Sequence, residues 1–183
     1  MDEIKFYGRG GQGAVIASII LAGAAFREGK FVQAFPFYGI ERRGTPVAAY
    51  TRIDTKPIRS RGQIHKPTVV VVLDPYLMQA LDITQGLNSD GIVVLNTDKA
   101  PKDLDFAKKF KVFTCDATSI AVKHSLGAKT APIINTAILG AFARATGLVK
   151  LESILAAMPE KVSLRLEDNI EAAKEAYSAT KSI

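Results

Sequence analysis

The chain contains 183 residues, of which 48% are hydrophobic and 23% are charged. This composition is typical of a globular protein, and the length suffices for one α/β domain with its own core. The 24 basic and 18 acidic residues give a formal net charge of +6, and the first sixty residues carry nine basic and five acidic side chains. The surplus favours an anionic ligand or an acidic partner surface. The absence of a Lys/Arg run and of an RNA-binding aromatic motif argues against nucleic acid.

Cysteine usage and hydropathy exclude further classes of protein. Cys115 is the single cysteine. The chain therefore cannot form an internal disulfide, nor hold by itself an iron–sulfur cluster, which usually needs four thiolates. No apolar run reaches the ~18 residues of a membrane-spanning helix, and the N-terminus does not resemble a signal peptide. We therefore expect a cytoplasmic protein without a membrane contact.

The first predicted elements enclose a glycine-rich loop. Residues 4–7 read as a strand and residues 14–26 as a helix. A glycine turn between them exposes backbone N–H groups at a helix N-terminus, which suits a phosphate group. The predicted cofactor-binding residues of this loop are Gly8, Arg9, Gly10, Gly11, Gln12 and Gly13.

The loop satisfies the G-x-G-x-x-G spacing, but this spacing alone does not specify a dinucleotide. A dinucleotide site also needs an acidic residue about 20 residues further on, which holds the ribose. The second predicted strand, 31–35, ends without one, so a nicotinamide or flavin site is disfavoured. Three interpretations remain: another phosphate-bearing ligand, packing against another subunit, or a tight turn without a ligand.

Strands and helices alternate along the rest of the chain. Further strands are predicted at 31–35, 47–53, 68–73, 91–95 and 111–115, and further helices at 76–83, 117–126, 133–146, 151–158 and from about 163 onward. Continuous β-branched runs such as 68–73 indicate strands buried on both faces. The predicted fold is a single-domain α/β protein with an open, mostly parallel, Rossmann-like sheet and helices on both faces.

A polar cluster lies in the connection that follows the second predicted strand. Guanidinium groups bind phosphates and carboxylates in a bidentate manner, and the ends of parallel strands converge on one crevice. We expect the cluster to reach the crevice of the glycine loop, because its strand is expected to neighbour the strand of that loop. The alternative is a solvated turn. The predicted binding residues are Arg42, Arg43, Gly44 and Thr45.

Other polar residues at strand ends have simpler explanations. Asp74, Asn96 and Asp116 follow predicted strands, and helix capping is their expected role. His65 and His124 lie far apart in the sequence and lack the spacing of metal ligands. No catalytic or metal-ligating residue is therefore predicted in this chain.

Three stretches together resemble one known family. The glycine loop, the turn at 35–39 (FPFYG) and the stretch at 41–47 (ERRGTPV) are similar to the gamma subunit of the 2-oxoacid:ferredoxin oxidoreductases. The likeness covers essentially all of residues 1–183, which we interpret as one gamma-type domain. In the 2-oxoglutarate branch the third stretch tends to begin Glu-Ala-Arg-Gly-Gly. Arg42 and Thr45 depart from that pattern, and the chain is more similar to the pyruvate and 2-ketoisovalerate branch.

The resemblance implies a function within a larger assembly. Enzymes of this kind oxidatively decarboxylate a 2-oxoacid to an acyl-CoA and reduce ferredoxin. Thiamine diphosphate, Mg²⁺ and iron–sulfur clusters are expected on partner chains, namely thiamine-binding alpha and beta subunits and a ferredoxin-like delta subunit, and none on this chain alone. The gamma chain is expected to shape the assembly and the coenzyme A site, with the glycine loop, Arg42 and Arg43 near the phosphates, without being catalytic alone.

Two alternatives remain open. The same residues can serve adhesion between subunits rather than coenzyme A binding. The chain can also be a stand-alone nucleotide-binding Rossmann-like module without redox chemistry. In that case it would be a stable monomer or homodimer that binds nucleotide without a partner.

Overall fold

A computed structural model describes residues 1–37 and 45–183, which form a six-stranded sheet, a two-stranded sheet and helices. The strands are β1 (Asp2–Arg9), β2 (Phe31–Phe37), β3 (Pro46–Asp54), β4 (Val69–Val72), β5 (Ile92–Asn96), β6 (Lys111–Cys115), β7 (Gly127–Ala128) and β8 (Ala131–Pro132). The α-helices are α1 (Ala14–Arg27), α2 (Ala117–Lys123), α3 (Asn135–Thr146), α4 (Leu151–Ala157) and α5 (Leu166–Ala179). The 3-10 helices are η1 (Pro75–Gln79), η2 (Pro101–Asp103), η3 (Asp105–Lys108) and η4 (Met158–Glu160). None of the helices in these two ranges is long and apolar enough to cross a bilayer.

The large sheet is mostly parallel but contains one reversed strand. Its strand order is β2-β3-β1-β4-β5-β6, and β1, β4, β5 and β6 are parallel neighbours. β3 pairs antiparallel with both β1 and β2. The expectation that the second strand neighbours the glycine-loop strand is therefore wrong, because β3 lies between them. The connection 38–45 is too short for the crossover that a parallel pair needs, so β3 returns antiparallel to β2.

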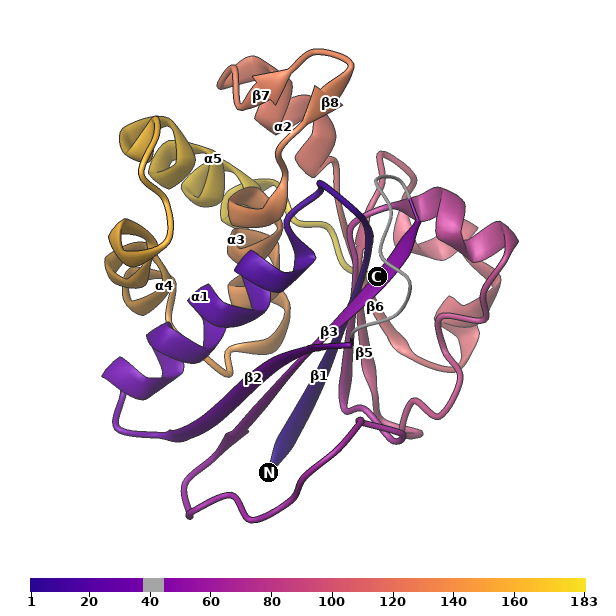
Figure 1. Cartoon of the computed structure of the whole chain (residues 1–183). Helices are drawn as coiled ribbons and strands as arrows, with labels where there is room; N and C mark the ends of the chain where they lie inside the picture. Colours follow the sequence, from indigo (N-terminus) through magenta and orange to yellow (C-terminus); the bar gives the residue numbers. More distant parts are fainter. Residues whose placement is uncertain (38–44) are drawn as a thin grey trace.

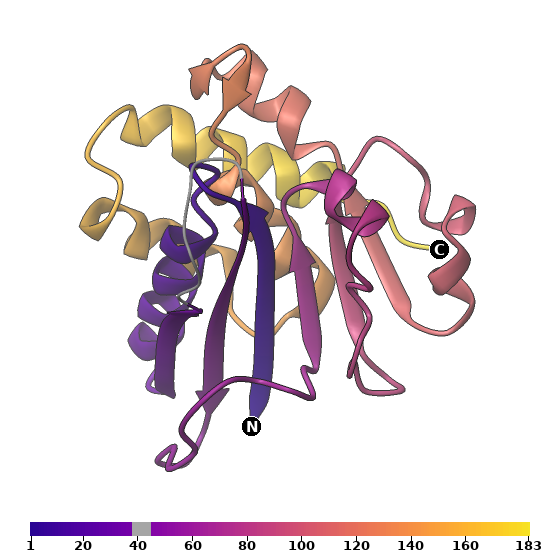
Figure 2. The same cartoon turned by 45° about the vertical axis from the view of Figure 1, so that its right-hand side comes forward.

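The two faces of the sheet are covered differently. On one face α1 and α3 pack on the strands, and α4 and α5 pack outside them, against α1 and α3 respectively (Figure 1). Phe6 and Val71 belong to the core on this side. On the other face, β4 to β6 share a second core with the segments around the 3-10 helices, including Leu77 and Leu104. Figure 2 shows these segments on the side of the sheet away from α1.

The predicted α/β class with a mostly parallel sheet is confirmed. The strand predicted at 111–115 forms with those bounds as β6, and the helix predicted at 14–26 forms as α1. The helix predicted at 76–83 is wrong in type, since the 3-10 helix η1 ends there at Gln79. The Asp82 carboxylate then accepts hydrogen bonds from the backbone N–H and the hydroxyl of Thr84. Such local side-chain bonds favour a turn over a continuing helix.

The two edges of the large sheet also differ. At the β6 edge, the backbone N–H groups of Thr114 and Lys181 each donate to the other residue's carbonyl, so the segment at 181 covers part of that edge. β2 forms the other edge, and no described strand pairs with its outer side. Its side chains are apolar apart from Gln33, and Phe31 and Phe37 are exposed. β2 is therefore the open, apolar edge of the sheet.

Candidate functional site at the carboxyl ends of the parallel strands

The glycine loop connects the end of β1 to the start of α1, as predicted. Gly11 and Gly13 have positive φ angles of 96° and 82°, a conformation that other residues rarely adopt. Gly13 is also the N-cap residue of α1. A Cβ atom on Gly13 would lie 2.6 Å from the Asn135 Nδ2 atom at the start of α3. Glycine is therefore required at position 13 both by the backbone conformation and by the close approach of α3.

Hydrogen bonds within the loop fix its shape. The Arg9 backbone N–H donates to the Gln12 Oε1 atom at 2.7 Å, and the Gln12 backbone N–H donates to the Arg9 carbonyl at 3.0 Å. The Gly10 N–H donates to the Thr45 carbonyl at 3.0 Å. The structure thus brings Thr45 to the loop, as predicted, because β3 begins beside the end of β1. The other predicted residues of that cluster, Arg42, Arg43 and Gly44, lie outside the described residues.

Asp74 joins the loop to the end of β4. Its Oδ1 atom accepts the Tyr76 backbone N–H at 2.9 Å, which is the predicted capping role. Its Oδ2 atom lies 2.6 Å from the Arg9 Nε atom in an ion pair, and 3.4 Å from the Gln12 Nε2 atom. The Asp74 side chain is 9% exposed and that of Arg9 is 36% exposed. The ion pair is therefore half-buried and ties Arg9, at the start of the loop, to the end of β4.

The loop opens into a cavity of about 600 Å³, called here the strand-end cavity. Its other walls come from the segments after β4, β5 and β6 and from the β7–β8 region. The lining residues are Arg9, Gly10, Gly11, Gln12, Leu73, Asp74, Pro75, Tyr76, Asn96, Thr97, Asp98, Asp116, Thr118, Thr130, Ala131, Pro132 and Ile134. Among these lining residues the charged side chains are one arginine and three aspartates.

Asn96 and Asp116 build the far wall of the strand-end cavity. The Asn96 Nδ2 atom donates to the Leu73 carbonyl at 2.8 Å and to the Thr118 hydroxyl at 2.9 Å. Asp116 caps α2, since its Oδ1 atom accepts the Ser119 N–H at 2.9 Å. The predicted capping role is confirmed for Asp116. The Asn96 Oδ1 atom also accepts an N–H of the first turn of α2, that of Thr118, at 3.2 Å, so Asn96 ties β4 to the start of α2. These bonds hold the ends of three parallel strands in a fixed arrangement.

Backbone donors of the loop remain available to a ligand. Within the part of the chain that the structure describes, the N–H groups of Gly11 and Gly13 donate no backbone hydrogen bond. The first turn of α1 contains no acidic residue, and no side chain caps it. Unbonded N–H groups at a helix N-terminus attract negative charge. Of these two glycines Gly11 lines the strand-end cavity, so its N–H group can donate to an anion there.

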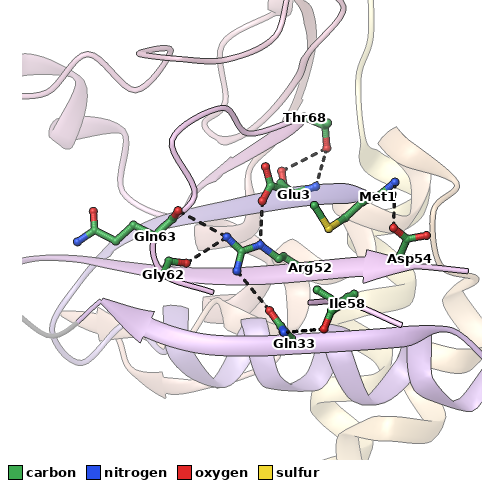
Figure 3. Close-up of polar contacts among 9 residues, drawn as sticks. All are labelled: Met1, Glu3, Gln33, Arg52, Asp54, Ile58, Gly62, Gln63 and Thr68. Atoms are coloured by element: carbon green, nitrogen blue, oxygen red, sulfur yellow. Dashed lines mark hydrogen bonds and ion pairs between the residues drawn. The ribbon is translucent and has the colours of Figure 1, made fainter. Parts of the chain in front are cut away.

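A second polar cluster lies on the face of the sheet opposite α1 and has a structural role (Figure 3). Arg52 on β3 is 3% exposed, and its Nε atom pairs with the Glu3 Oε1 atom at 2.8 Å. Its Nη1 atom donates to the Gln33 Oε1 atom at 3.2 Å, and Nη2 donates to the Gly62 carbonyl at 3.1 Å. The guanidinium group also lies 5.2 Å from the centre of the Phe35 ring. Arg52 thereby joins three strands to the segment that follows β3.

Comparison with known proteins identifies the family. Residues 3–179 match the family described as pyruvate ferredoxin/flavodoxin oxidoreductase. The chain is 58% identical over 184 aligned positions to the common gamma subunit of the pyruvate/ketoisovalerate oxidoreductases of Pyrococcus furiosus, with 98% of this chain and 97% of that protein covered. The chain belongs to this family. It is a gamma-type member, as the sequence motifs predicted.

Solved structures share the fold. Subunit PORC of the pyruvate oxidoreductase of Thermotoga maritima is 39% identical and superposes with a TM-score of 0.81, covering 99% of this chain and 97% of that one. A 2-oxoglutarate:ferredoxin oxidoreductase from Magnetococcus marinus, solved with 2-oxoglutarate, coenzyme A and succinyl-CoA bound, matches with a TM-score of 0.72 at 16% identity. That match covers 97% of this chain and 30% of the larger chain. The gamma-type fold therefore also occurs as part of a longer polypeptide.

Proposed function

We propose that this chain works as the gamma subunit of a multi-subunit 2-oxoacid:ferredoxin oxidoreductase acting on pyruvate or 2-ketoisovalerate, with residues 1–183 as one gamma-type domain. The assembled enzyme would decarboxylate the 2-oxoacid, transfer the acyl group to coenzyme A and pass two electrons to ferredoxin. Support comes from the family match over 3–179 and from the 58% identity to a gamma subunit along almost the whole chain. The names of these relatives, which are subunits of larger enzymes, support a complex with other subunits.

The partner chains would carry the cofactors of the reaction. We assign thiamine diphosphate with Mg²⁺ to alpha and beta subunits, and the iron–sulfur clusters to a ferredoxin-like delta subunit. These groups supply the carbanion chemistry and the electron transfer when bound. Cys115 is buried, and burial raises the pKa of its thiol to about 11, so this thiol is protonated at neutral pH. A cytoplasmic location agrees with this assignment and stays a prediction.

This chain's own contribution would be one wall of the coenzyme A site. The observation that carries this proposal is the Gly11 N–H group, which has no backbone partner among the described residues and belongs to a loop that lines the strand-end cavity. Ligands of open α/β sheets bind in the crevice beyond the carboxyl ends of the strands. Backbone N–H groups and the N-terminus of α1 would bind a phosphate of coenzyme A there.

The charged residues of the strand-end cavity indicate where the different parts of coenzyme A would lie. Asp98 and Asp116 on the far wall accept hydrogen bonds, so they suit the hydroxyl and amino groups of a nucleoside rather than its phosphates. The phosphates would lie at the glycine loop. The connection that carries Arg42 and Arg43 returns to this loop at Thr45, whose carbonyl accepts the Gly10 N–H. The phosphates need positive charge, which the aspartates of the cavity cannot provide. Arg42 and Arg43 would supply it.

Replacing both arginines tests this assignment in the purified complex. We expect the Arg42→Ala/Arg43→Ala enzyme to remain assembled and to show a KM for coenzyme A raised roughly tenfold or more, since charge-assisted hydrogen bonds to phosphate are lost. The KM for the 2-oxoacid should not change. Arg59→Ala/Arg61→Ala is the matched control, because both of these arginines are exposed in the segment after β3. An unchanged KM for coenzyme A in the first variant would refute the assignment.

The Arg9–Asp74 ion pair favours a second role for the same loop. It occupies the Nε donor of Arg9 and ties the loop to the end of β4, so the loop would present a fixed surface to a partner chain. If the loop and its arginines serve adhesion, the Arg42→Ala/Arg43→Ala variant would instead dissociate the complex, as seen by size-exclusion chromatography. A tagged pull-down at low salt separates both roles from a stand-alone nucleotide-binding module. That module would be recovered without thiamine-binding or cysteine-rich chains.

A further inference from the structure

A second cavity lies on the sheet face opposite α1 and has no role in the function proposed above. It measures about 290 Å³ and lies between β1, β2 and β3 and the segment that follows η1. The residues that matter here are Lys5 and Tyr7 on β1, Tyr50 on β3, and Phe37, Leu81 and Asp82 at its rim. We call it the Lys5 cavity.

Lys5 places a half-buried positive charge in this cavity without a carboxylate partner. Its Nζ atom lies 4.6 Å from the centre of the Tyr7 ring and 5.9 Å from that of Tyr50. No carboxylate within the described ranges lies within 4 Å of it, Asp82 included. The two rings stabilise the ammonium group through cation–π interactions. A half-buried ammonium group is stabilised further when an anion joins it.

The hydroxyl groups of Tyr7 and Tyr50 also favour an anionic ligand. Tyr7 is 8% exposed and Tyr50 is 3% exposed, yet both line the cavity, and within 1–37 and 45–183 neither hydroxyl makes a hydrogen bond. Burial raises the pKa of both phenols, with the Asp82 charge adding to the effect at Tyr7 and the Lys5 charge opposing it at Tyr50. Both hydroxyls therefore stay protonated at neutral pH and can donate to an anion.

We propose that the Lys5 cavity receives an acidic side chain of a partner subunit, whose carboxylate accepts hydrogen bonds from the Lys5 ammonium and the tyrosine hydroxyls. The proposal rests on the function proposed above, since it requires that the chain works in a complex. Three donors around one open cavity fit a single carboxylate. Asp82 also lines the cavity, so a single carboxylate fits better than a free ligand with several negative charges.

The surroundings of the cavity favour a polypeptide over a small molecule. Its volume lies at the lower limit of small-molecule pockets, which are about 300–1,000 Å³ and enclose most of their ligand. Phe37 is 42% exposed and Leu81 is 36% exposed, so apolar surface continues outward from the cavity, and β2 beside it is the open edge of the sheet. Buried tyrosines surrounded by apolar surface are typical of the energetic centre of a protein interface.

Carbodiimide cross-linking of the purified complex tests this contact directly. The reagent condenses a carboxylate with an amine in contact to form an amide, and takes up the water that is released. We expect peptide mapping to find Lys5 joined to one aspartate or glutamate of an identified partner subunit. Lys102, which is exposed on η2, should give no such link. Absence of a Lys5 link, or a link from Lys5 to a carboxylate of this same chain, would overturn the proposal.

Variants measure how much the contact contributes to association. Lys5→Met keeps the apolar stem between the rings and removes the charge, so we expect the subunit to dissociate from the complex roughly thirtyfold more readily than with Lys102→Met. The melting temperature of the isolated chain confirms that each variant folds. Binding of propionate to the isolated chain that requires Lys5, with unchanged association, would assign the cavity to a small carboxylate and contradict the proposal. Failure of the unmodified chain to recover any partner would instead refute the proposed function.

Discussion

Arg52 carries a buried charge whose partners come from distant parts of the sequence. Glu3, Gln33 and the Gly62 carbonyl lie in three different segments, and all accept hydrogen bonds from the one guanidinium group. A buried charge is tolerated when its hydrogen-bonding groups are satisfied, and losing one partner leaves the others buried and unpaired. The planar guanidinium group distributes its donors over three nitrogens and so reaches acceptors on three segments, whereas all donors of an ammonium group radiate from one nitrogen.

We predict that Arg52→Met lowers the free energy of unfolding by about 3 kcal/mol, within the range of about 3–5 kcal/mol observed when a buried ion pair is broken. Arg52→Lys should also be destabilising, because the single ammonium group reaches fewer of the acceptors. Urea unfolding followed by circular dichroism measures both. A change of less than about 1 kcal/mol in Arg52→Met would show that water enters the cluster and satisfies the remaining groups.

The residues of the candidate site differ in how far the sequence could reveal them. The glycine loop is predictable, because its members are neighbours in the chain and glycine has few other reasons to recur at that spacing. The Arg9–Asp74 pair joins positions 65 residues apart, and only the folded sheet places them together. Lys5 was missed for the same reason. The alternation of polar and apolar residues along β1 predicts on which face of the sheet Lys5 lies, but it does not show that two tyrosines surround it.

Two glycines within α-helices show how closely the helices approach one another. A Cβ atom on Gly140 of α3 would lie 1.9 Å from the Ala173 carbonyl oxygen of α5, so the two helices contact each other through the backbone. A Cβ atom on Gly23 of α1 would lie 3.7 Å from the Ala157 Cβ atom of α4, which is ordinary van der Waals contact. Helices are predicted from the sequence at both places.

The two glycines should therefore respond to alanine with opposite signs. Gly140→Ala forces α3 and α5 apart, and we predict a loss of about 1–3 kcal/mol in the free energy of unfolding, or more. Gly23→Ala gains helix propensity without a clash, and we predict a gain of about 0.5–1 kcal/mol. Chemical denaturation of both variants provides the measurement. Two effects of the same sign would show that the α3–α5 contact adjusts more freely than the structure implies.

The direction of β3 is an aspect of the sheet that the hydrophobic pattern of the sequence did not predict. Its existence was predicted at 47–53, and it forms at Pro46–Asp54. Its direction was not predicted, because a Rossmann-like pattern led us to expect neighbouring parallel strands. The short connection before Pro46 contained the relevant signal, since it leaves no room for a helical crossover. Loop length would thus have corrected the strand order, whereas hydrophobic pattern could not.

Carboxylates that join distant segments make the stability of the whole chain depend on pH. Burial alone would raise the pKa of Glu28, but hydrogen bonds from the Lys150 backbone N–H and the Lys30 ammonium group lower it below its usual value. Hydrogen bonds from Lys123 and His124 likewise lower the pKa of Glu175 on α5. A lowered pKa in the folded state means that the ionised group stabilises the fold above its unfolded pKa of about 4.3.

We predict that this stabilisation is lost as pH falls from about 5 through the lowered pKa values of these two groups. Urea midpoints should decrease over that interval and stay nearly constant between pH 6 and pH 8. Glu28→Gln should reduce the midpoint near neutral pH and flatten the acidic part of the profile. An equally steep acidic decline in Glu28→Gln would show that Glu28 contributes nothing to it.

The difference between the two edges of the large sheet limits how copies of this chain can polymerise. Growth of a fibril by edge pairing needs two free edges on every molecule, because each copy must accept a neighbour on either side. The pairing of Lys181 with Thr114 covers part of the β6 edge and leaves β2 as the open one. Two copies that meet through β2 would pair their longer open edges with each other and form a closed pair. This one bridge therefore favours finite assemblies over open-ended aggregates, although β2 is long and apolar.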